Sequence, residues 1–218
     1  MPGSTGNRLR LVKMIVLICG LGPATGWAQK EAPGVEQVFA TCAVCHGQRA
    51  EGKRALQAPG LTALSAAYIA RQLRNFAAGT RGAHPEDTHG AQMAAAVSQL
   101  GEGPVLERLA TYIAALPAVT PEATVSGDLK RGKDFYSMVC GSCHGPAAEG
   151  NVKLQAPALA GTDDWYLVRQ LEHFRAGIRG GEGADALDVQ MRSMAQILPD
   201  TAAVHNVVAY IQSLVVSP

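Results

Sequence analysis

The sequence predicts an all-α protein built from two tandem domains, and three observations support that fold class. The chain repeats itself at an offset of 98 residues, which indicates a duplicated unit. Within each copy the apolar residues recur at helical spacing, and no segment convincingly shows the alternating pattern of a strand. Residues 118–126, between the copies, contain Pro121 and lack a strong periodicity, as expected of a linker.

The repeat sets the domain organisation. Residues 42–116 align with residues 140–214 without a gap, and 28 of the 75 paired positions are identical. Each copy holds roughly 90 residues, a size at which a domain often depends on a cofactor or a covalent link for stability. We predict a first domain over residues 29–117, a linker over residues 118–128 and a second domain over residues 129–218.

The first 28 residues have the features of a secretory signal peptide. A basic segment (residues 8–13) precedes a short apolar run (residues 14–21) and a small-residue end (residues 26–28). The apolar run is short for a membrane-spanning helix. We therefore expect residues 1–28 to be cleaved and the mature chain to be periplasmic. An uncleaved segment that anchors the chain to the membrane remains the alternative.

Three helices are expected in the first copy. A short helix should begin near Gly34 and end at the first cysteine motif. A second should cover residues 66–78, with Ser65 as N-cap and Gly79 as its end. The last should cover residues 104–116, which carry one apolar face.

The second copy repeats these signals. Its first helix should begin near Gly132, Asp163 precedes the equivalent of the second helix, and Gly177 follows it. Its last helix carries its apolar face at Val204, Val207, Ile211 and Leu214.

Composition limits the function classes. Charged residues make up 17% of the chain and the hydrophobic set 47%, which favours a folded core over disorder. The formal net charge is +1, so no basic surface indicates nucleic-acid binding. Aromatic residues make up only 5%, and a chain so rich in alanine can still fill its interior if a cofactor supplies the bulk.

Two cysteine motifs suggest which cofactor. Cys42-Ala43-Val44-Cys45-His46 recurs as Cys140-Gly141-Ser142-Cys143-His144. The cysteines alone would also fit a disulfide, a redox dithiol or half of a zinc site. The histidine after the second cysteine favours covalent haem attachment, in which both thiols form thioethers and the imidazole binds the iron. We therefore predict two haem c groups, with His46 and His144 as iron ligands.

Methionines at equivalent positions are the candidates for the opposite iron ligand. Met93 and Met191 each follow their motif histidine by 47 residues. A thioether opposite an imidazole favours Fe(II) and raises the reduction potential. The alternative is that both are ordinary core residues, as most methionines are.

The remaining methionines and histidines are not shared by the two copies. Met194 and Met138 correspond to Ala96 and Ala40, so neither is a shared ligand, and Met138 is assigned to the core. His84 and His89 are expected in a loop. His173 and His205 are expected on exposed helix faces.

These motifs resemble the class I cytochromes c, in the tandem dihaem arrangement of cytochrome c4. The resemblance covers residues 35–216 and rests on the two Cys-x-x-Cys-His motifs, the late methionines, Ala58-Pro59-x-Leu61 with its copy Ala156-Pro157-x-Leu159, the Tyr-x-x-Arg-Gln-Leu segments that begin at Tyr68 and Tyr166, and the Tyr-Ile pairs at Tyr112 and Tyr210.

The resemblance implies two tandem class I cytochrome c domains, each wrapped around one covalently bound haem. It also implies that the carbonyls of Pro59 and Pro157 accept a hydrogen bond from the iron-binding imidazoles, which would fix each ring; an ordinary turn proline is the alternative. Arg71, Arg169, Arg81 and Arg179 are left open between a haem propionate, a linker carbonyl and solvent.

The leading hypothesis for function is a periplasmic electron carrier that cycles two His/Met-ligated haems between Fe(III) and Fe(II), and not an enzyme. Its partners would be redox protein donors and acceptors, such as a respiratory complex, an oxidase or a dehydrogenase. It would associate with a membrane only through a partner or an uncleaved signal segment. One alternative is a dedicated cytochrome subunit of an oxidase or dehydrogenase complex. Another is a haem enzyme or ligand sensor with five-coordinate iron.

Overall fold

The computed structural model describes residues 1–3, 34–101 and 103–214. The predicted signal peptide therefore lies, apart from its first three residues, outside the described residues. Within the described part of the chain, no helix is long and apolar enough to cross a membrane.

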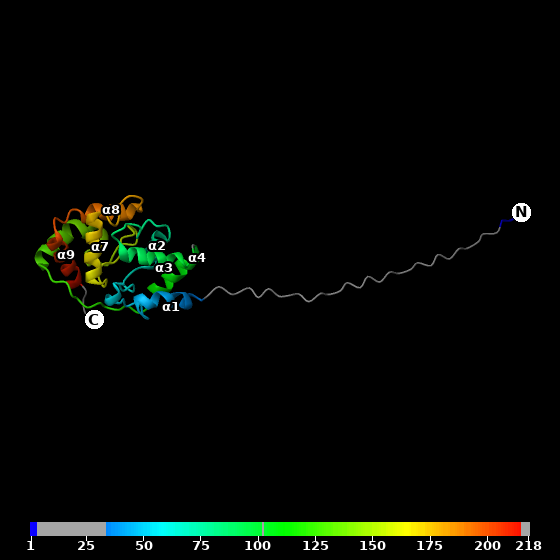
Figure 1. The fold of residues 1–218 in the computed structure, drawn as a ribbon, viewed down its shortest axis with the longest axis horizontal. Coiled ribbons are helices and arrows are strands. Elements are labelled where there is room, and N and C mark those ends of the chain that lie inside the picture. The colour runs from blue at the N-terminus through cyan, green and yellow to red at the C-terminus, as the bar shows by residue number, and fades with distance from the viewer. Residues whose placement is uncertain (4–33, 102, 215–218) are drawn as a thin grey trace. The chain divides into compact units, whose positions relative to one another are not determined.

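The described residues of the first copy form four helices, which Figure 1 labels, and one short 3-10 turn. They are α1 (Val35–His46), η1 (Arg54–Leu56), α2 (Ala66–Ala77), α3 (Thr88–Ser98) and α4 (Pro104–Ala114). Helix α4 packs against both α1 and α2, and α3 packs against α2. The core between them consists of buried apolar side chains, which include Phe39, Leu73, Leu109 and Ile113.

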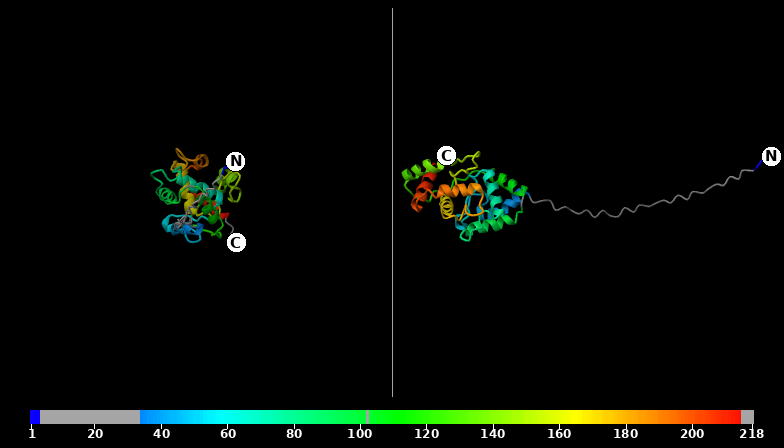
Figure 2. Two further views of the ribbon diagram at one scale, coloured as in Figure 1. Left: turned by 90° about the vertical axis from the view of Figure 1, so that its right-hand side faces the viewer. Right: turned by 90° about the horizontal axis from the view of Figure 1, so that it is seen from above.

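The second copy has the same arrangement, with an interrupted first helix. Its elements are α5 (Leu129–Phe135), the π-helical turn η2 (Tyr136–Cys140), α6 (Gly141–His144), α7 (Asp164–Ala176), α8 (Ala186–Ala195) and α9 (Thr201–Ser213). Helix α9 packs against α5 and α7, and α8 packs against α7. Figure 2 shows the helices of both copies from two further directions.

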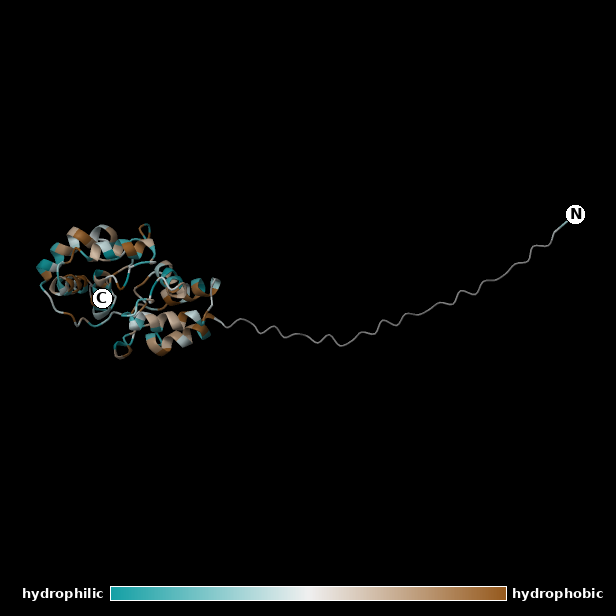
Figure 3. Cartoon of the chain, turned by 45° about the horizontal axis from the view of Figure 1, so that its top comes forward, coloured by the Kyte–Doolittle hydropathy of each residue, from teal (hydrophilic) through white to brown (hydrophobic). Residues whose placement is uncertain are grey.

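The all-α prediction is confirmed. The described residues contain no strand, only two isolated bridges that recur at the repeat offset, Lys53–Ala58 and Asn151–Ala156. Figure 3 shows apolar and polar residues on the same helices, as expected of helices that bury one face and expose the other.

The expected ends of the second helix are present in the first copy and only partly in the second. The Ser65 hydroxyl accepts a hydrogen bond from the Tyr68 amide at the start of α2. Gly177 adopts the left-handed conformation after α7. Asp163, however, does not cap α7 with its side chain. Its carboxylate accepts a hydrogen bond of 2.7 Å from the amide of Gly60, in the other copy.

The first helix of the second copy begins three residues earlier than expected, at Leu129. The Asp128 carboxylate accepts hydrogen bonds from the amides of Lys130 and Arg131 and so starts the helix there. Gly132 instead lies inside the helix, where a Cβ atom would come within 2.0 Å of the Asn206 carbonyl oxygen of α9. The glycine permits close packing of two helices rather than marking a helix start.

The assignment of Met138 to the core is wrong. Its side chain is 70% exposed, and its counterpart Ala40 is exposed as well, so this position faces outward in both copies. The core beside it is filled by Tyr136, which is 1% exposed and packs against Tyr210 with ring centroids 5.6 Å apart. Exclusion as a shared ligand does not place a methionine in the core, and this position faces outward both in the regular helix α1 and in the π-helical turn.

A buried carboxylate fixes the segment between the copies. Asp164, at the start of α7, is fully buried. It accepts hydrogen bonds from the Thr124 amide, the Thr124 hydroxyl at 2.9 Å, the Val125 amide at 2.6 Å and the Trp165 amide at 2.6 Å. Burial raises the pKa of Asp164, but these donors together lower it below its ordinary value of 3.8.

Asp164→Asn is expected to destabilise the protein by about 3 kcal/mol. The new side-chain NH2 group cannot accept a hydrogen bond, so backbone N–H groups that now bond to the carboxylate would be left without an acceptor. The lowered pKa means that the carboxylate stabilises the fold fully above pH 3.8 and loses this effect as the pH falls further. Urea unfolding at pH 7 and pH 3 measures both effects. The exposed cap variant Asp128→Asn serves as control, and an equal loss in both variants would contradict the special role of Asp164.

Candidate functional site

Both Cys-x-x-Cys-His motifs lie at the end of a helix. In the first copy, Cys42, Cys45 and His46 occupy the last turns of α1. His46 is 7% exposed, and its Nδ1 atom lies 2.8 Å from the carbonyl oxygen of Pro59. A cysteine three residues before another on a helix shares its face, so both thiols can point to one group.

The second motif has the same geometry. Cys140 ends the π-helical turn, and Cys143 and His144 lie in α6. His144 is 6% exposed, and its Nδ1 atom lies 2.8 Å from the carbonyl oxygen of Pro157. The hydrogen bond that the resemblance implies is therefore present in both copies.

The two imidazoles are held neutral and in one tautomer. Burial lowers the pKa of His46 and of His144 and outweighs the proline carbonyls, which raise it. Because Nδ1 donates its hydrogen to the carbonyl, the Nε2 lone pair is left free on the opposite side of the ring. A neutral imidazole with a free Nε2 is the form that binds a metal.

The thiols do not have the properties of a reactive dithiol. Burial, with a smaller contribution from Cys143, raises the pKa of Cys140 to about 12. Burial also raises the pKa of Cys42. Redox dithiols require a lowered thiol pKa. In the described part of the chain, no group of three or more His, Cys, Asp or Glu side chains is arranged to hold a metal ion.

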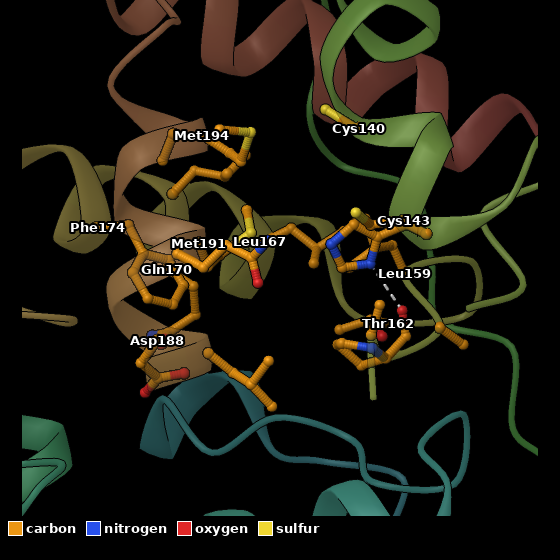
Figure 4. A pocket seen from close by; sticks show the side chains of 18 of the residues that line it. Cys140, Cys143, Leu159, Thr162, Leu167, Gln170, Phe174, Asp188, Met191 and Met194 are labelled. Atoms are coloured by element: carbon orange, nitrogen blue, oxygen red, sulfur yellow. Dashed lines mark hydrogen bonds between the residues drawn. The ribbon is translucent and has the colours of Figure 1, made fainter. Parts of the chain in front are cut away.

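An apolar cavity joins the parts of the second motif. It is lined by Cys140, Cys143 and His144 on one side and by Met191 on the other. Figure 4 shows Met191 and Met194 projecting from α8 toward the side of the cavity that carries the two cysteines. The rest of the cavity lining is mostly apolar and includes Leu159, Leu167, Phe174, Leu198, Val207 and Ile211.

In the first copy, Cys42 and Met93 are brought to the same core. Both side chains are partly buried and pack against the apolar cluster that contains Phe39, Leu73 and Phe76. Met93 lies in α3 and Met191 in α8, at equivalent positions. Helix α3, which carries Met93, packs against α2, and helix α8, which carries Met191, packs against α7.

Helices α3 and α8 were not predicted from the sequence. An aspartate that occupies the same position in both copies could have indicated where these helices begin. Asp87 caps α3 by accepting a hydrogen bond from the Gly90 amide, and Asp185 caps α8 by accepting from the amides of Leu187 and Asp188.

The expectations for the other histidines are partly wrong. His84 is exposed in a loop as expected, but His89 is the second residue of α3. His205 is only half-exposed. The His173 side chain is 16% exposed and lies against Asp87 of the first copy, with Nδ1 and Oδ1 3.7 Å apart. Its counterpart Asn75 donates to Asp185 at the equivalent contact, so position 173 faces the other copy and not solvent.

A network with approximate twofold symmetry connects the copies, which belong to one compact unit over Pro33–Pro218. Arg81 donates to Gln72 within its own copy and to Tyr166 and Gln170 in the other. Arg179 donates to Gln170 within its copy and to Tyr68 and Gln72 in the other. Each guanidinium also lies over a phenylalanine ring, Phe76 or Phe174, at 4.4 Å and 4.5 Å from the ring centroid.

The network carries more positive than negative charge. Arg81 and Arg179 are both buried, and within the described residues only Arg179 has a carboxylate partner, Asp188. Buried donors also stay without acceptors, among them Arg71 Nε and Nη1, Arg81 Nε and Gln72 Nε2. A haem brings two carboxylates beside a large apolar ring system. The apolar cavity and the free donors of Arg71, which lines it, therefore fit that group.

Comparison with known proteins agrees with the site. The sequence profile of the cytochrome c family matches residues 129–215. The chain is 29% identical to cytochrome c4 of Azotobacter vinelandii over 95% of its length and 99% of that protein. It is 31% identical to the thiosulfate dehydrogenase electron acceptor of Thiomonas intermedia over 73% of its length and 77% of that protein.

A solved structure has the same fold. Reduced recombinant cytochrome c4 from Pseudomonas stutzeri superposes with a TM-score of 0.64 at 24% identity, covering 82% of this chain and 95% of that one. The duplication, the paired haem-attachment motifs and the relatives agree with one another. The chain belongs to the dihaem class I cytochromes c, is similar to cytochrome c4, and is an electron-transfer protein with two covalently bound haem c groups.

Proposed function

We propose that each motif holds one haem c group, with Cys42 and Cys45 attaching the first and Cys140 and Cys143 the second. His46 and His144 would each bind the iron of their haem, and Met93 and Met191 would supply its second protein ligand. The observation that carries this assignment is the cavity of the second copy. The cysteines, the histidine and the methionine of that copy all line this single apolar space.

When bound, each haem supplies a one-electron Fe(III)/Fe(II) couple. The chain's own residues orient and enclose it. The Pro59 and Pro157 carbonyls fix the imidazoles through their Nδ1 hydrogens, which makes Nε2 a stronger donor. The apolar walls exclude water, and a thioether from α3 or α8 stabilises the reduced state.

With both a histidine and a methionine bound, the iron would have no open position for a substrate. This is the basis for assigning the chain as a carrier and not as an enzyme or ligand sensor. Residues 29–117 and 129–218 form the two haem domains in this proposal, and residues 118–128 connect them. Residues 1–28 direct export, so the carrier works in the periplasm.

The partners are redox proteins that dock transiently and exchange single electrons. A specific observation favours a second candidate function, a dedicated acceptor for one dehydrogenase. The chain is 31% identical to a thiosulfate dehydrogenase electron acceptor. Purification of the native protein distinguishes the two functions, because a general carrier is recovered as a free monomer and a dedicated subunit is recovered in a stable complex with its dehydrogenase.

The haem assignment predicts separate effects in the two copies. Cys42→Ala is expected to leave the first haem attached through one thioether, so that denaturing extraction or mass spectrometry shows weakened attachment at that copy alone. Cys140→Ala is expected to do the same in the second copy. Loss of both haems in either single variant would contradict the assignment of one haem to each copy.

A further inference from the structure

Two equivalent arginines have different environments. Arg169 of α7 reaches the first copy, where Nη1 donates to the Gln57 side chain and Nη2 to the Gln57 carbonyl, both at 3.1 Å. Arg71 of α2 is its counterpart, and Gln155 is the counterpart of Gln57. Arg71 does not form the equivalent bonds. Its Nε and Nη1 atoms are buried and have no hydrogen-bond partner among the described residues.

Arg71 lies at the haem cavity of the other copy. It lines the cavity that contains Cys140, Cys143 and His144, together with Leu64 and Tyr68 from its own copy. Residues of the first copy thus complete the wall of the cavity in the second copy. The Arg71 guanidinium lies over the Tyr68 ring, 5.3 Å from its centroid.

The nearby carboxylate of Asp185 does not serve as the missing acceptor. One of its oxygens accepts from the amides of Leu187 and Asp188, and the other accepts from the Asn75 side chain. Arg71 is half-buried, and its two buried donors, Nε and Nη1, are costly because their hydration is lost without replacement. Its planar fork matches a carboxylate. A carboxylate on a group that enters the cavity would supply the acceptor that these donors lack.

We propose that Arg71 of the first copy binds a propionate carboxylate of the haem held by the second copy. This inference rests on the proposed function, which places that haem in the cavity. The cation stabilises Fe(II) relative to Fe(III), because reduction removes one positive charge from the site. Arg71 thereby raises the reduction potential of the second haem, and Arg169, already bonded to Gln57, has no equal effect on the first.

The test compares Arg71→Gln with Arg169→Gln as the matched control. Both are made in a Met93→Ala background, in which the near-infrared methionine–iron(III) band comes from the second haem alone. Redox titration of that band should show the Fe(II)/Fe(III) ratio of Arg71→Gln falling about tenfold at a fixed electrode potential, which equals about 59 mV for one electron. Arg169→Gln should change this ratio less than about twofold. Arg71→Lys should keep the ratio near that of the parent, because lysine retains the positive charge.

The reciprocal Met191→Ala background reports the first haem, whose ratio should not change in Arg71→Gln. Equal shifts in Arg71→Gln and Arg169→Gln, or a shift of the first haem as large as that of the second, would overturn the proposal. If Arg71→Gln does not fold, Arg71→Lys decides alone. An Fe(II)/Fe(III) ratio of the second haem near that of the parent supports the charge role, and a fall of about tenfold contradicts it. A parent protein without two methionine-ligated haems would instead refute the proposed function, before any arginine variant is compared.

Discussion

Met93→Ala is expected to convert the first haem from a low-spin electron carrier into an open site that binds carbon monoxide or cyanide. Loss of the thioether removes the ligand that favours Fe(II), so the potential of the first haem should fall by on the order of 0.2 V, within the ~0.8 V range that axial ligands cover. Absorption spectra of the oxidised variant should keep half of the near-infrared methionine–iron(III) band, because the proposed ligand of the second haem, Met191, is unchanged.

The controls for this variant come from the repeat. Met191→Ala should give the mirror result, with the second haem opened and the first unchanged. Met194→Ala should keep the full band, although Met194 lines the same cavity as Met191, because its counterpart in the first copy is alanine. An unchanged spectrum in Met93→Ala would show that this residue does not bind iron.

Asp188→Asn should lower the free energy of unfolding by about 3–5 kcal/mol, the cost of leaving one partner of a buried ion pair uncompensated. Asp188 is 2% exposed, and both of its oxygens accept hydrogen bonds from Arg179, at 3.0 and 3.1 Å. Its removal would leave Arg81 and Arg179 buried in one network without a carboxylate partner in the described chain. Urea unfolding followed by circular dichroism measures the loss.

The control is an ion pair on the surface. Arg74 and Glu107 also form a salt bridge, but their side chains are 52% and 50% exposed. Glu107→Gln should therefore cost no more than about 1 kcal/mol. A similar cost for Glu107→Gln and Asp188→Asn would mean that the Arg179–Asp188 pair is not the buried anchor of the interface.

The fold was predictable because the duplication reports the same structure twice. Positions such as Ser65 and Gly177, at the ends of the second helix of each copy, act through local hydrogen bonds and backbone conformation, which a sequence displays directly. Met138 was misassigned because it was placed in the core only after being excluded as a shared ligand, although its counterpart Ala40 also faces outward.

Contacts between the copies were not predictable from either copy alone. Asp163 has the residue type of a helix cap, yet its carboxylate bonds Gly60 across the interface. His173 appeared exposed because its own helix gives no sign of the Asp87 side chain opposite. Such residues are determined by partners 80 or more positions away in the chain, whereas the Cys-x-x-Cys-His motif is recognised because all its parts are adjacent.

The most direct test of two His/Met-ligated haems is a redox-titrated absorption spectrum of the haem-loaded protein, with haem counted per chain. We expect two haems per chain, both low-spin and fully reducible, with the near-infrared methionine–iron(III) band at full strength for two sites. A high-spin fraction that readily binds carbon monoxide or cyanide would contradict this coordination, and the chain would then be a haem enzyme or ligand sensor rather than a carrier.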